Sequence, residues 1–106
     1  MAIYRADLHA HSLNGSSSHF PYNSSPKQMV EAAKKKEISI FALSEKEKPI
    51  EAYRMIKNLC EEYGMVTFPV QEVTSRDGDM LGIDITEVIK NPKKLSCYEA
   101  ADEIIA

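Results

Sequence analysis

The chain has 106 residues, 43% of them hydrophobic, and a formal net charge of −3 at pH 7. This length allows a single domain over residues 1–106, and the charge gives no basis for nonspecific binding to nucleic acid. No apolar run approaches the length of a membrane span, and the first residues lack a signal-peptide pattern. We therefore expect a cytoplasmic protein without membrane contacts, in which Cys60 and Cys97 are reduced thiols rather than a disulfide.

The first half of the chain is predicted to alternate between strands and a helix. Residues 3–11 predict a strand, and the short apolar run at residues 38–43 predicts a buried strand. Between them a helix is expected from Pro26, because Ser25 is a suitable N-cap and Gln28 completes a capping box. Polar loops are expected at residues 12–24 and 44–48.

A second helix is predicted from Pro49 to about Gly64, where apolar residues recur at helical spacing before a glycine. A third strand follows at residues 65–70. This order of strands and helices implies parallel strands joined by crossover helices, which is an α/β arrangement.

The last third of the chain is predicted to form a hairpin followed by a helix. Residues 72–85 indicate the hairpin, because Asp77-Gly78 is a strong two-residue turn signal between β-prone segments. The helix is expected at residues 95–105, where Ser96 and Glu99 form a second capping box.

The sharpest chemical signal is the motif Asp7-Leu8-His9-Ala10-His11 at the end of the first strand. Alternate residues of a strand face the same side, so Asp7, His9 and His11 should project together where α/β folds place their sites. Two imidazoles held in this way can share a divalent ion, while Asp7 accepts a ring N–H and fixes its tautomer. The alternative is two unrelated surface histidines, since His-x-His also occurs by chance.

This motif resembles the opening motif of the PHP (polymerase and histidinol phosphatase) superfamily. Two later segments agree with the family in order and strand context over nearly the whole chain. Phe41 to Lys46 lies where the family has Thr-Asp-His, and Pro69 to Gly82 lies where it has a glutamate and then a hairpin histidine. The resemblance implies about half of a distorted (β/α)7 barrel, with parallel strands, crossover helices and one β-hairpin.

The resemblance also implies a metal site and a reaction. His9, His11 and Glu72 fall on ligand positions, and Asp79 replaces the hairpin histidine with another group that can bind a divalent ion. The expected metals are Mn, Zn or Fe. The expected activity is hydrolysis of phosphate esters by a metal-dependent phosphoesterase. The substrate would be a phosphorylated small molecule or a nucleotide.

Several other positions are weaker candidates. Asp7 would orient a ligand histidine without binding the metal itself. Glu45 could add a carboxylate near the metal, although a polar turn is the simpler interpretation of that residue. His19 is a candidate in the loop, although a solvated loop residue is favoured there. Lys46 stands where the family has a ligand histidine, and an ammonium group has no lone pair to donate to a metal.

The family's later ligand motifs, Ala-His-Pro and Asp-x-His, have no counterpart here. We therefore expect an incomplete metal site with impaired or absent catalysis in this chain alone. We also expect that the chain is either a fragment or self-associates as a homo-oligomer that covers the open sheet edge. An alternative is a non-catalytic structural or interaction module in which Lys46 pairs with Glu72 or Asp79. A less favoured alternative is an amidohydrolase-type barrel, which also opens with His-x-His.

Overall fold

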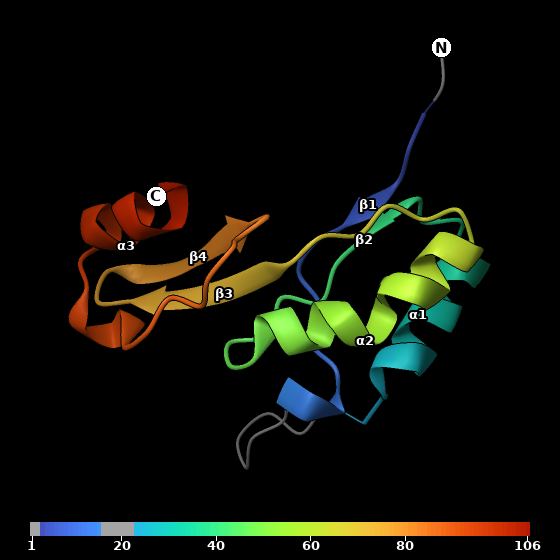
Figure 1. Cartoon of the computed structure of the whole chain (residues 1–106), viewed down its shortest axis with the longest axis horizontal. Coiled ribbons are helices and arrows are strands. Elements are labelled where there is room, and N and C mark those ends of the chain that lie inside the picture. The colour runs from blue at the N-terminus through green and yellow to red at the C-terminus, as the bar shows by residue number, and fades with distance from the viewer. Residues whose placement is uncertain (1–2, 16–22) are drawn as a thin grey trace.

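A computed structural model describes residues 3–15 and 23–106, and it shows a small parallel sheet, an antiparallel hairpin and three α-helices (Figure 1). This mixed arrangement agrees with the α/β composition expected from the sequence. In chain order the elements are β1 (Ala6–Asp7), η1 (Leu13–Gly15), α1 (Pro26–Lys35), β2 (Ile40–Phe41), α2 (Pro49–Glu62), β3 (Val70–Ser75), β4 (Gly78–Ile83), η2 (Pro92–Lys94) and α3 (Cys97–Ile105).

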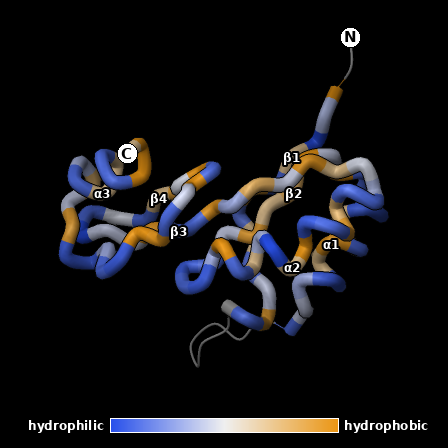
Figure 2. Tube along the Cα trace, in the orientation of Figure 1, coloured by the Kyte–Doolittle hydropathy of each residue, from blue (hydrophilic) through white to orange (hydrophobic). Residues whose placement is uncertain are grey.

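The first core lies between the parallel strands and helices α1 and α2. Strand β1 pairs in parallel with β2, and Ile40 forms a further parallel bridge with Val66. Hydrophobic and hydrophilic residues alternate along both helices (Figure 2), and hydrophobic residues of both helices pack into this core. The buried residues of this core include Val30, Ala33, Phe41, Leu43, Ala52, Ile56 and Cys60.

The parallel strands are shorter than predicted, because beyond β1 several main-chain N–H groups donate to side chains instead of to a neighbouring strand. Beyond β1, the main-chain N–H of His9 donates to Asp7 Oδ1 at 3.2 Å, and that of Ala10 donates to Ser44 Oγ at 3.1 Å. The N–H of Ser12 donates to Glu45 Oε1 at 3.3 Å. The third predicted strand, at residues 65–70, contributes only one isolated bridge before β3 begins.

The hairpin forms as predicted, but its turn is displaced by one residue. Ser75 pairs with Gly78, so Arg76 and Asp77 make the turn and Gly78 is the first residue of β4. Gly78 has a φ of 134°, which favours glycine. The Ser75 hydroxyl donates to the Gly78 carbonyl at 2.8 Å and accepts from the Asp77 N–H at 3.2 Å, which closes the turn.

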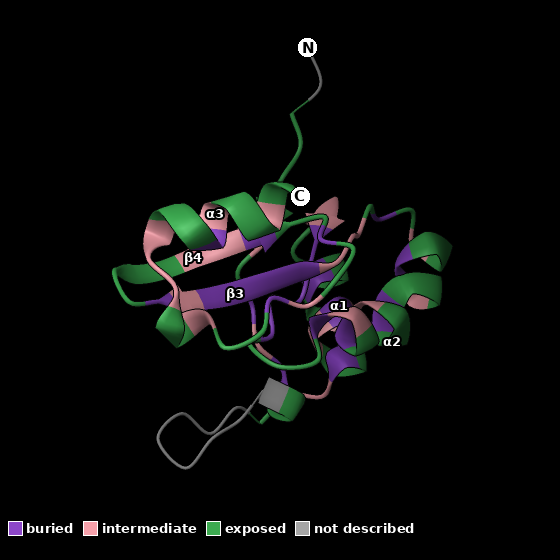
Figure 3. Cartoon of the chain, turned by 60° about the vertical axis from the view of Figure 1, so that its left-hand side comes forward, coloured by how far each residue is buried: buried purple, intermediate pink, exposed green. Residues whose placement is uncertain are grey.

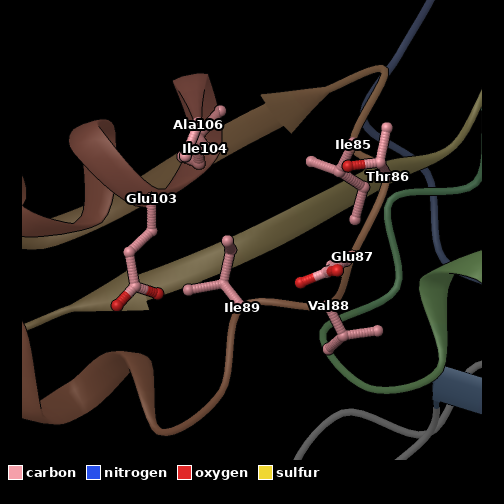
Figure 4. A pocket seen from close by; sticks show the side chains of 8 residues that line it. All are labelled: Ile85, Thr86, Glu87, Val88, Ile89, Glu103, Ile104 and Ala106. Carbon is pink, nitrogen blue, oxygen red and sulfur yellow. The ribbon is translucent and has the colours of Figure 1, made fainter.

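The second core lies between the hairpin and α3. Strand β3 is buried along most of its length, while α3 turns an exposed face outward (Figure 3). Val73, Ile89 and Ala100 are its buried members. A cavity of about 320 Å³ lies between the end of α3 and the segment after β4, beside Ile85, Ile89 and Ile104 (Figure 4).

The predicted helix starts are confirmed. Both capping boxes form, with Ser25 and Gln28 at α1 and with Ser96 and Glu99 at α3. Both cysteines are free. Within residues 3–15 and 23–106, no helix combines the length and apolar character needed to cross a membrane.

Candidate metal centre

Three side chains converge on one point, two from the segment that follows β1 and one from β3. His9 Nε2 lies 3.0 Å from Glu72 Oε1, and His11 Nε2 lies 2.8 Å from the same oxygen. The two imidazole rings meet edge to face, with their centroids 5.4 Å apart. One potential ligand atom from each residue lies within 4.8 Å of the others. The predicted convergence of two imidazoles with a carboxylate is therefore present.

The three residues differ in how far solvent reaches them. The side chain of Glu72 is 7% exposed and that of His11 is 11% exposed, whereas that of His9 is 54% exposed. The group is therefore anchored in the protein on one side and open to water on the other. An open side is what a metal site needs if it is to bind a substrate.

The buried carboxylate of Glu45 orients the His11 ring through Nδ1, the nitrogen that does not contact Glu72. His11 Nδ1 lies 3.2 Å from Glu45 Oε1, and the Ser12 hydroxyl donates to Glu45 Oε2 at 2.7 Å. Glu45 is only 1% exposed, so it is not part of a solvated polar turn. The role of orienting a ring, predicted for Asp7, therefore falls to Glu45, since Asp7 instead accepts the main-chain N–H of His9.

The donor set fits one divalent ion. Tetrahedral ligands at about 2.0–2.2 Å from a metal are roughly 3.3–3.6 Å apart. The two imidazole nitrogens lie 3.0 and 2.8 Å from Glu72 Oε1, so the three groups would need to separate by only about half an ångström to admit an ion. Two histidines and one glutamate form a ligand set of zinc hydrolases, and two histidines with a carboxylate also bind Fe(II). A carboxylate behind a ligand histidine, as Glu45 lies behind His11, is typical of metal sites.

The other predicted site residues lie apart from this group. Asp79 is exposed on β4 opposite Thr74, whereas Glu72 pairs with Leu81, and Asp79 does not belong to the cluster of potential ligands. Lys46 is exposed and, among the described residues, makes no ion pair with Glu72 or Asp79. The alternative in which Lys46 replaces the metal and pairs with Glu72 or Asp79 is therefore not what the structure shows. His19 lies outside the described residues.

Sequence reasoning missed three residues that support the site. Ser12 binds Glu45, and the hydroxyl of Ser44 bonds both the N–H and the carbonyl of Ala10. The amide of Gln71, next to Glu72, bonds main-chain atoms of Lys46 and Ile89. All three are almost fully buried. Burial of a small polar residue beside a site motif leaves no periodic signal in a single sequence.

The contacts of His11 favour its charged form. The pKa of His11 is raised, mainly by its hydrogen bond with Glu45; burial lowers it, and the hydrogen bond with Glu72 and the charges of both carboxylates raise it further. Carboxylate oxygens only accept hydrogen bonds, so both ring nitrogens are satisfied together when the ring is an imidazolium.

We expect a pH dependence of the metal-free protein from this shift. Because the folded pKa lies above the unfolded value of about 6.5, charged His11 stabilises the fold fully below that value, and this contribution is lost as pH rises through the folded pKa. Urea denaturation of wild type and His11→Gln from pH 5.5 to 8.5 would measure it. The difference in unfolding free energy should shrink as pH rises, and a constant difference would contradict the expectation.

No family model, curated protein or solved structure matches this chain. His9, His11 and Glu72 therefore carry the functional inference through their own geometry.

Proposed function

We propose that this chain is a PHP-type domain that binds one divalent ion through His9, His11 and Glu72 and hydrolyses phosphate esters. The observation that carries the proposal is the convergence of these three side chains on a point open to solvent. The parallel pairing of β1 with β2 and the crossover through α1 support membership of a distorted barrel family, of which this chain would form about half.

Each residue has a defined task in this proposal. A divalent ion at the site would supply an activated water and stabilise negative charge on a phosphoryl group. His11 is kept in one orientation by Glu45, so its Nε2 lone pair can face the ion while Nδ1–H is held. His9 is the exposed ligand at the edge of the site. Asp79 lies outside the cluster, so a single ion and modest turnover are expected.

A second candidate is a metal-free module without catalysis. The observation in its favour is that His11 already lies between Glu45 and Glu72 at hydrogen-bonding distances of 3.2 and 2.8 Å. A protonated ring satisfies both carboxylates without any ion. The two candidates therefore differ in whether a metal competes successfully with a proton for His11.

Metal titration separates the two candidates. The full chain would be titrated with Mn²⁺, Zn²⁺ and Fe²⁺ while thermal unfolding is followed, and bound metal would be counted by elemental analysis. We expect one ion per chain, a rise in Tm and hydrolysis of p-nitrophenyl phosphate. Glu72→Gln should lose all three, while Asp79→Asn, which is outside the cluster, should keep them. Wild type that neither retains metal nor gains stability would favour the metal-free module.

A further inference from the structure

A cleft of about 700 Å³ opens directly beside the candidate metal centre. Its first wall is the loop before α2, its second wall is the segment from β4 through η2, and Glu72 and Thr74 of β3 lie between them. Glu72 therefore belongs both to the cluster of potential metal ligands and to the lining of the cleft. A molecule in the cleft would lie next to the metal centre.

The cleft concentrates positive charge on a protein that is negative overall. Five of its lining residues are lysines and two are glutamates, although the chain carries a net charge of −3. The lysines stand on both walls, Lys46 and Lys48 on the first and Lys90, Lys93 and Lys94 on the second. Within the part of the chain that the structure describes, none of them makes an ion pair. The cleft thus presents unneutralised cations from two sides.

The backbone of both walls is held in an uncommon conformation. Lys48 has a φ of 53°, in the left-handed region that costs free energy for a lysine, and Asn91 has a φ of 51°, in the same region, which asparagine adopts more readily. Lys48 is also the N-cap of α2 and gives that helix no side-chain cap. The start of α2 therefore lies at one end of the first wall, while Glu51 and Ala52 of the helix line a different pocket.

We propose that this cleft binds a small phosphate ester that carries two or more phosphate groups, and that the lysines of the two walls hold different phosphates. The inference rests on the proposed hydrolase function and names its substrate class. Lysine is a common ligand of phosphate, and cations on opposite walls suit separated charges better than one phosphate. The cleft has the volume of a single small-molecule site. Among the residues that the structure describes, its lining contains no aromatic side chain on which nucleic-acid bases could stack.

Calorimetry with matched probes tests the proposal. Fructose 1,6-bisphosphate and fructose 6-phosphate share one sugar and differ in phosphate number, and both would be titrated into the metal-free full chain. The bisphosphate should bind at least roughly tenfold more tightly, since a charge-assisted hydrogen bond contributes that much. Equal affinity for the two probes would overturn the proposal, as would tighter binding of a ten-residue oligothymidylate.

Variants assign the binding to the two walls. Lys46→Gln with Lys48→Gln, and separately Lys93→Gln with Lys94→Gln, should each weaken bisphosphate binding at least roughly tenfold. The control is Lys35→Gln with Lys57→Gln, which removes the same charge from exposed positions outside the cleft and should bind normally. Wall variants that behave like the control would overturn the proposal. All variants should keep the metal-induced rise in Tm, so a failure of the cleft and a failure of the metal centre give different results.

Discussion

Replacing His11 with alanine should destabilise the metal-free protein by about 3 kcal/mol, because it leaves two carboxylates near each other without their shared partner. Glu45 and Glu72 are almost fully buried, and His11 lies between them. His9→Ala should cost less, about 1 kcal/mol, because that side chain is 54% exposed and Glu72 keeps its contact with His11. Urea denaturation with a metal chelator present would measure both effects.

The same two variants should behave alike toward metal. Each removes one of the three potential ligands, so each should lose the stabilisation that the wild type gains, about 2.7 kcal/mol at a metal concentration 100 times Kd. His9→Ala therefore separates metal binding from folding. If His9→Ala kept the full metal response, His9 would not be a ligand. If His11→Ala were as stable as wild type, the carboxylates would not depend on its ring.

The parts of the fold that could be predicted are those with local signals. Both capping boxes are encoded within four residues, and α2 starts at a proline and ends before Gly64, whose φ is 71°. The hairpin was also predictable, although its turn was not. The displaced turn depends on the Ser75 hydroxyl and on the φ of Gly78, which the dipeptide Asp77-Gly78 alone does not reveal.

The strand lengths could not be predicted, because they depend on contacts between distant residues. Ala10 bonds Ser44 and Ser12 bonds Glu45, each across more than 30 positions of sequence. The side chains of Ser44 and Glu45 accept main-chain N–H groups at positions where hydrogen bonds between strands were expected. The histidine pair was predictable because its spacing of two on a strand indicates it, whereas Glu72 was expected only from the resemblance to the PHP superfamily. Glu45 was underestimated, because nothing in a single sequence marks a polar loop residue as buried.

Gln71→Leu should destabilise the protein by about 2–3 kcal/mol, since it leaves buried main-chain groups without partners. The Gln71 amide accepts the Ile89 N–H at 2.8 Å and donates to the Ile89 carbonyl at 3.0 Å and the Lys46 carbonyl at 3.3 Å. Leucine has a similar volume but can make none of these bonds. Chemical denaturation would give the loss, and faster amide exchange at Ile89 would locate it.

Thr74→Val provides the matched control on the same strand. The Thr74 hydroxyl is buried and, within the described residues, has no hydrogen-bond partner, so its removal should cost little or even stabilise the fold. The contrast matters because Gln71 ties the first wall of the cleft, at Lys46, to the second wall, at Ile89. Equal stability of the two variants would show that this bridge does not hold the walls together, and the cleft would then need another origin for its shape.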